Sequence, residues 1–200
     1  TAERHIAGEV IVSRLTTPES TEMHALIARM REKSVTDIAI EVSAQAMTQH
    51  RVDGLVFDVA GFTNLSHDHL DDYGDMDTYL KAKALLFTPQ HARKGVICLD
   101  SEFGKVFAAS ATIPFVTISS NSQIESDWQV SVTEELPGRT SFSLVNSVGQ
   151  KLNSSLPIIG AHMAHNAGLA IAMLVEAGYA FENIEIAIAK GIDVYMPGRT

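Results

Sequence analysis

The sequence of 200 residues has little cysteine, no excess of positive charge and no long apolar segment. Its one cysteine, Cys98, excludes an internal disulfide and a multi-cysteine metal site, and it fits a reducing compartment. Fifteen basic residues against twenty-four acidic ones give a net charge of −9, so nucleic-acid binding has no electrostatic support. The apolar run 168–175 is far shorter than the ~20 residues that span a bilayer. The start of the chain also lacks the basic and apolar regions of a signal peptide. We therefore expect a soluble, cytoplasmic protein with neither nucleic acid nor a membrane as its partner.

The first 120 residues alternate between two kinds of hydrophobic pattern. Short apolar runs predict strands, and apolar residues at helical spacing predict helices between them. The expected strands are 37–42, 57–62, 95–99 and 114–118, and the expected helices are 18–33, 75–88 and 101–110. Thr17, directly before a proline, is expected to cap the first helix. This alternation predicts an α/β fold with a mainly parallel sheet flanked by helices.

Residues from about 119 to 156 have a different character, rich in serine, asparagine and threonine. Alternating segments at 128–132 and 141–145 lie on either side of Pro137-Gly138, which predicts an antiparallel hairpin in a small side sheet. Two helices, 161–177 and 181–189, are expected to follow, with Gly178 ending the first. Residues 196–200 are expected to begin a linker.

The densest group of ligand-type side chains, His67-Asp68-His69 with Asp71, follows the strand 57–62. In open α/β sheets, ligands bind at the carboxyl ends of the strands, and Glu41 ends its own predicted strand. A carboxylate and an imidazole at this edge suit a hard divalent cation, with Mg²⁺ favoured when phosphates complete its shell. A solvated polar loop explains the same residues equally well.

Lys83 falls inside the apolar stripe of the predicted helix 75–88, whereas Lys81 points away from that stripe. A buried lysine is costly unless its charge is removed or paired. One resolution is a lowered pKa and chemical use of the free amine. The other is a lysine that extends its ammonium to solvent at the edge of the stripe, and the pattern alone favours this second reading.

Four further features carry weaker indications. Arg51 could hold an anionic substrate, and Thr16-Thr17 could contact an anion as well as cap a helix. Asn166 lies on the helix expected at 161–177, where its amide could read the edge of a base. His162 and His165 are interpreted as surface or core histidines rather than metal ligands.

Several strings in this sequence occur together in one known family. The chain resembles the central domain of the Mur ligases, and most closely the branch that adds the third residue to UDP-N-acetylmuramoyl-L-alanyl-D-glutamate. The resemblance extends from end to end, and the stretch 62–83 is its most specific part. The strings, in order, are Leu15-Thr-Thr-Pro-Glu19, Glu41-Val-Ser43, Gln49-His-Arg-Val-Asp-Gly54, Phe62-Thr-Asn-Leu-Ser-His-Asp-His-Leu-Asp71, Gly74-Asp-Met76 and Lys81-Ala-Lys83.

The resemblance implies an ATP-dependent amide ligase that joins an amino acid to the UDP-N-acetylmuramoyl dipeptide through an acyl phosphate. Glu41 and His69 match Mg²⁺ ligands of the family. Lys83 matches a lysine that carries a CO₂-derived carbamate and helps to place a second Mg²⁺, which makes these three the implied catalytic residues. Asn166 matches a contact to adenine. The positions that match substrate-binding residues are Thr16, Thr17, Ser43, Gln49 and Arg51.

The chain also departs from the family pattern. The glycine-rich phosphate loop with its Gly-Lys-Thr is absent, and the resemblance places it before Thr1 and a further domain after residue 200. Residues 1–200 are therefore expected to be a central-domain fragment that is inactive alone. Gln45 stands where the family usually has histidine, and Asp72-Tyr73 where it has Tyr-His.

Two alternatives remain open at this point. The missing phosphate loop would fit a non-catalytic binding domain that keeps the same fold. A metallohydrolase could use the His67-x-His69-x-Asp71 pattern, although it would need further histidines at later strand ends.

Overall fold

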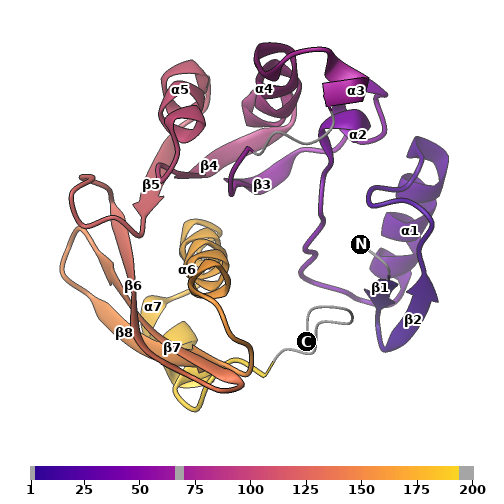
Figure 1. Cartoon of the computed structure of the whole chain (residues 1–200). Coiled ribbons are helices and arrows are strands. Elements are labelled where there is room, and N and C mark those ends of the chain that lie inside the picture. Colours follow the sequence, from indigo (N-terminus) through magenta and orange to yellow (C-terminus); the bar gives the residue numbers. More distant parts are fainter. Residues whose placement is uncertain (1–2, 66–69, 194–200) are drawn as a thin grey trace.

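A computed structural model describes residues 3–65 and 70–193 of the chain, and a six-stranded sheet forms its centre (Figure 1). The order of the strands in the sheet follows their order in the sequence, β3-β4-β5-β6-β7-β8. Neighbours from β3 to β6 pair in parallel, and β6, β7 and β8 pair antiparallel. The strands are β3 (Phe57–Phe62), β4 (Ala92–Cys98), β5 (Phe115–Ser119), β6 (Trp128–Leu136), β7 (Arg139–Asn146) and β8 (Lys151–Leu156).

Helices cover both faces of this sheet. The longest, α6 (Ala161–Glu176), packs against all six strands, which curve around it in Figure 1, and α7 (Phe181–Ile188) packs against β8. The opposite face is covered by α4 (Met76–Ala84), the 3₁₀ turn Leu85–Phe87 and α5 (Glu102–Ser110). Val96 and Ile97 are consecutive on β4 and fully buried, yet they belong to separate cores on the two faces. The predicted α/β class is therefore confirmed.

The predicted hairpin is confirmed, but it does not form a sheet of its own. β6 pairs in parallel with β5 through Ile118–Trp128 and Ser119–Gln129, so the antiparallel strands continue the main sheet. The sequence pattern could not show this, because the parallel contact spans only two residue pairs at the start of β6. Gly138 forms the turn between β6 and β7 with a φ of 75°.

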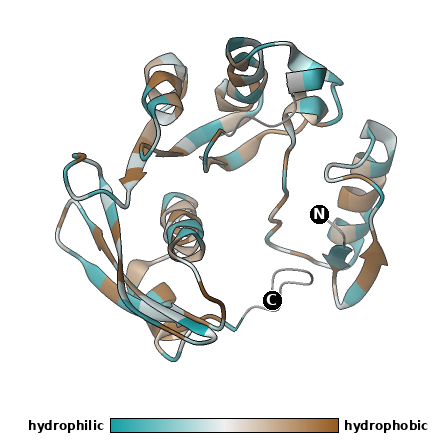
Figure 2. Cartoon of the chain, in the orientation of Figure 1, coloured by the Kyte–Doolittle hydropathy of each residue, from teal (hydrophilic) through white to brown (hydrophobic). Residues whose placement is uncertain are grey.

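A second, two-stranded sheet that the sequence did not predict lies near the N-terminus. It pairs β1 (Glu3–Ile6) with β2 (Glu9–Val12), next to α1 (Ser20–Glu32). β2 is largely hydrophobic (Figure 2), yet its Val12 is 81% exposed. This strand therefore places an apolar side chain outside the core.

The strand predicted at 37–42 is wrong. Residues 35–43 are without regular secondary structure, and we call them the 35–43 segment. Its apolar pattern is that of a strand, but a strand needs a neighbour for its backbone hydrogen bonds. Among the described strands, β3 is the edge of the sheet and pairs only with β4.

The contact between α5 and β4 leaves no room for a side chain at Gly104. A Cβ built there would lie 2.1 Å from the carbonyl oxygen of Cys98, at the carboxyl end of β4. Because that oxygen belongs to the backbone of the central sheet, it cannot rotate away. Gly104 therefore sets how closely α5 approaches the strand end.

We expect Gly104→Ala to lower the free energy of unfolding by about 1–2 kcal/mol, because the steric overlap outweighs the gain in helix propensity. Urea unfolding followed by circular dichroism measures the change. Lys105→Ala, at an exposed neighbouring position, should stay within about 0.5 kcal/mol of the unmodified chain. Unchanged stability of Gly104→Ala would show that α5 can shift away from β4.

Candidate functional site

Two adjoining pockets reach the carboxyl ends of the parallel strands, and the larger one also extends along β3. The larger, about 340 Å³, lies between the 35–43 segment, β3 and α4, and contains Glu41 and Lys83; we call it the Lys83 pocket. The smaller, about 160 Å³, lies between the ends of β4 and β5 and one side of α6; we call it the α6 pocket. Thr63, Asn64 and Leu169 line both. This is the edge where ligands bind in open α/β sheets.

Lys83 is half-buried in the Lys83 pocket, as the sequence pattern predicted. Its ammonium lies 5.2 Å from the centre of the Tyr79 ring. Burial lowers the pKa of Lys83, and the charge of Glu41 partly opposes this effect. Lys81 is exposed and pairs with Asp77 at 2.6 Å, which confirms the predicted difference between the two lysines.

Thr17 does not cap α1, which corrects the expectation from the sequence. The helix begins at Ser20 after Glu19, and no side chain caps it. The Thr17 hydroxyl is fully buried, donates to the carbonyl oxygen of Glu41 at 2.9 Å, and accepts from the amide of Ser43 at 3.0 Å. The side chain therefore holds the backbone on both sides of position 42 and fixes where Glu41 enters the pocket.

Arg51 holds the backbone at Thr17 and so supports the same part of the chain. It is 9% exposed, and one guanidinium nitrogen donates to the carbonyl oxygen of Thr17 at 3.2 Å. The other lies 2.5 Å from the side-chain oxygen of Gln49 and 3.0 Å from the carboxylate of Glu19. Ser43 caps α2 (Ala44–Thr48) by accepting from the amide of residue 46 at 3.1 Å. These residues form one network around α2.

The remaining predicted residues differ in what the structure says of them. Thr16 is half-buried beside Thr17. His67, Asp68 and His69 lie outside the described residues, as does the predicted linker at 196–200. In the described parts of the chain, no three histidine, cysteine or acidic side chains come together as a metal site. Asp71 is exposed on the short helix α3 (Leu70–Tyr73).

Two positions that depart from the family pattern contact each other. The side-chain amide of Gln45 donates to Asp72 at 2.6 Å and links α2 to α3. Tyr73, which follows Asp72, also differs from the family pattern. Its hydroxyl is buried, and burial raises its pKa. The changed residues therefore form a local contact of their own beside the pocket.

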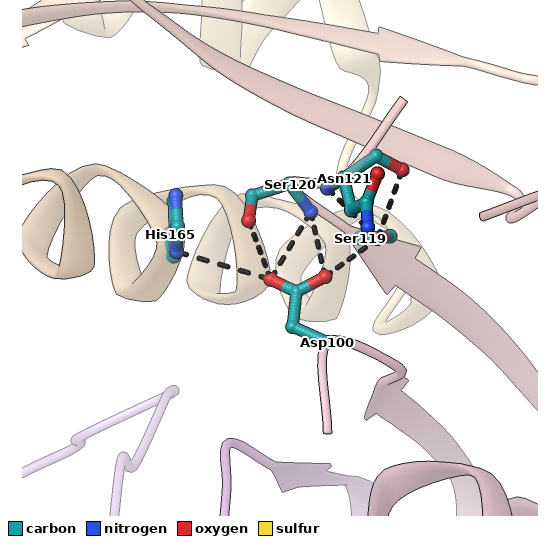
Figure 3. Close-up of polar contacts among 5 residues, drawn as sticks. All are labelled: Asp100, Ser119, Ser120, Asn121 and His165. Atoms are coloured by element: carbon teal, nitrogen blue, oxygen red, sulfur yellow. Dashed lines mark hydrogen bonds and ion pairs between the residues drawn. The ribbon is translucent and has the colours of Figure 1, made fainter. Parts of the chain in front are cut away.

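The α6 pocket contains Asn166 and a pair of residues that the sequence reasoning missed. Asp100 follows β4, and its carboxylate lies 3.9 Å from Nδ1 of His165 on α6 (Figure 3). His162, His165, Asn166 and Leu169 recur at helical spacing and share the side of α6 that faces the pocket. That spacing, together with an acid directly after a strand, was the available indication in the sequence.

Comparison with known proteins identifies the fold family. Residues 1–174 match the Mur ligase middle domain. The chain belongs to the Mur ligase family. This confirms the resemblance drawn from the motifs.

Its relatives within the Mur ligase family are considerably longer. A UDP-N-acetylmuramyl-tripeptide synthetase from Leifsonia xyli subsp. xyli is 55% identical over 201 residues, covering 100% of this chain and 39% of that protein. A UDP-N-acetylmuramoyl-L-alanyl-D-glutamate–2,6-diaminopimelate ligase from Streptomyces coelicolor is 40% identical over 178 residues, covering 89% of this chain and 35% of that protein. A solved structure of a ligase with the same name shares the fold, with a TM-score of 0.79, 24% identity, and coverage of 93% of this chain and 39% of the other. The chain thus spans less than two-fifths of the length of these relatives.

The described helices give no indication of a membrane span. None combines the length and the apolar character that crossing a bilayer requires.

Proposed function

We propose that the chain is the middle domain of an ATP-dependent ligase that adds an amino acid to UDP-N-acetylmuramoyl-L-alanyl-D-glutamate. The names of its relatives, a tripeptide synthetase and diaminopimelate ligases, agree with this substrate class. The observation that carries the proposal is that Glu41 and Lys83, from two separate segments, line one pocket beside β3. Because the reaction consumes ATP, we infer that it takes place in the cytoplasm.

The proposed reaction has two steps. A carboxylate oxygen of the muramoyl dipeptide attacks the γ-phosphorus of ATP, which releases ADP and leaves an acyl phosphate. The amine of the incoming amino acid then attacks the acyl carbon, loses a proton and expels inorganic phosphate. The first step brings the substrate carboxylate close to the phosphates of ATP. Because all of these groups are anionic, the site must offset their negative charge.

Two residues of the Lys83 pocket, Glu41 and Lys83, can supply oxygen ligands to Mg²⁺, Lys83 as its carbamate. Glu41 offers a carboxylate, and the burial that lowers the pKa of Lys83 favours the neutral amine that carbamate formation requires. The neutral amine of Lys83 attacks CO₂ and loses a proton to solvent, which leaves an anionic carbamate. Glu41 and His69 would hold one Mg²⁺, and the carbamate of Lys83 would help to place a second. When bound, Mg²⁺ neutralises charge on the phosphates.

The substrates are assigned to the two pockets by their surroundings. The network of Thr17, Ser43, Gln49 and Arg51 borders the Lys83 pocket through Ser43. We assign the muramoyl dipeptide to that side, where Thr16 directly precedes Thr17. Asn166 lies in the α6 pocket, and we assign the nucleotide there. The domains that flank this one in the longer relatives would complete both sites.

Phosphate release by the full-length protein tests the proposal. With ATP, Mg²⁺, the muramoyl dipeptide and a series of amino acids including diaminopimelate and lysine, we expect release only when all substrates are present. The 200-residue chain alone should release no phosphate at a comparable rate, since its sequence has no Gly-Lys-Thr phosphate loop. Dipeptide binding without release by the full-length protein would instead support a non-catalytic binding domain.

A further inference from the structure

The carboxylate of Asp100 is held firmly at the edge of the α6 pocket. One oxygen accepts from the hydroxyl of Ser119 at 2.5 Å and from the amide of Ser120 at 2.9 Å. The other accepts from the same amide at 3.1 Å and from the hydroxyl of Ser120 at 2.6 Å. His165 faces this second oxygen with Nδ1, and its Nε2 lies on the opposite side of the ring from Asp100 (Figure 3).

These surroundings determine what the imidazole can offer. Burial would raise the pKa of Asp100, but the hydrogen bonds from Ser119 and Ser120 outweigh it and the pKa is lowered, so the carboxylate is charged at neutral pH. Burial lowers the pKa of His165, with a smaller opposing effect from Asp100 and a further lowering from His162, so the ring is neutral. The adjacent negative charge favours the proton on Nδ1. Nε2 is then an acceptor.

The rest of the α6 pocket suits an uncharged group rather than a phosphate. Its described lining contains no lysine or arginine, and the Asp100 carboxylate repels anions. Ile118, Val130 and Leu169 form an apolar wall. A flat ring with polar edges fits such a pocket, because its face can pack on the apolar wall while its edges bond to the polar side chains.

We propose that Nε2 of His165 accepts a hydrogen bond from the nucleoside part of the bound nucleotide. The donor is an amino group of the base or a hydroxyl of the ribose. The inference rests on the proposed function, which assigns ATP to this pocket beside Asn166. Asp100 is the positioning residue: its carboxylate faces Nδ1 of His165, so that Nε2, the acceptor, points away from Asp100.

Nucleotide affinities of the full-length protein test this role. Calorimetry would give the Kd of ATP, of purine riboside triphosphate, which lacks the amino group, and of 2′-deoxy- and 3′-deoxy-ATP. His165→Phe keeps a ring but removes the acceptor, and we expect it to raise the Kd of ATP roughly three- to tenfold, as for one hydrogen bond. His165→Gln, which retains an acceptor, should recover part of the affinity. His5→Ala, at an exposed histidine of β1, is the control.

The analogues separate the two donors. If the amino group of the base is the donor, the wild-type protein binds purine riboside triphosphate more weakly than ATP, and His165→Phe discriminates less between the two. If the ribose is read, the same loss of discrimination appears with a deoxy analogue. Unchanged affinities and ratios in His165→Phe would overturn the proposal while leaving the ligase function intact. Should that variant not fold, a wild-type protein that discriminates against none of the analogues would overturn it equally. A full-length protein that binds no ATP would overturn the proposed function itself.

Discussion

Lys83→Ala in the full-length protein should lower kcat about a hundredfold or more, because it removes the group that carries the carbamate in the Lys83 pocket. Acetate or formate should restore part of the rate. A small carboxylate can occupy the space of the lost carbamate and offer the same oxygen ligands to Mg²⁺. Phosphate release at increasing acetate concentration, with all substrates saturating, measures the effect.

Lys81→Ala is the matched control for this prediction. Lys81 lies on the same helix two residues earlier, but it is exposed, with Asp77 in direct contact and Asp75 more distant. Exposed ion pairs contribute little to stability, so we expect near-normal activity that does not respond to acetate. Near-normal kcat of Lys83→Ala would contradict this prediction, and so would equal losses of kcat in both variants that acetate does not restore. Either result would show that Lys83 carries no carbamate and only extends its ammonium to solvent.

Much of the sheet and its helices could be predicted because their signals are local. β3 was expected at 57–62 and occupies Phe57–Phe62, since an apolar run between polar segments marks a buried parallel strand. The helix expected at 101–110 is α5 (Glu102–Ser110), and Ser101 caps it by accepting from the amide of Gly104. Such patterns depend on near neighbours in the sequence.

The errors arose where a partner distant in the sequence decides the structure. The 35–43 segment has a strand pattern, but no described strand pairs with it. Thr17 has the sequence context of a helix cap, yet its hydroxyl bonds to the backbone of Glu41 and Ser43, more than twenty residues away. Local propensity cannot show whether the hydroxyl of a threonine will bond to the start of the next helix or to a backbone segment distant in the sequence.

The candidate site divides in the same way. The half-burial of Lys83 followed from its place in the stripe of one helix, and the structure confirms it. The pairing of Asp100 with His165 depends on the approach of α6 to the end of β4, which topology alone establishes. Residues on separate elements therefore needed the three-dimensional structure before their shared chemistry could be recognised.

Thr17→Val should damage the site through Glu41. Valine keeps the size of threonine but leaves the carbonyl of Glu41 and the amide of Ser43 without their partner, at a cost of about 1–3 kcal/mol in the free energy of unfolding. The 35–43 segment then loses its hold beside the pocket. Because a displacement of about 1 Å at a reacting group can lower the rate a hundredfold, we expect kcat to fall between tenfold and a hundredfold. Thr17→Ser, which keeps the hydroxyl, should restore most of it.

Thr140→Val separates positioning from a general loss of stability. Thr140 is also fully buried, and its hydroxyl donates to the carbonyl of Ile158 at 2.8 Å and accepts from the amide of Gly160 at 3.1 Å. It makes the same pair of bonds away from Glu41, so we expect a similar loss of stability and a smaller loss of kcat. Urea unfolding and phosphate release, measured on both variants, provide the comparison. Equal losses of stability and of kcat in the two would mean that Thr17 only supports the fold and does not set the position of the Glu41 carboxylate.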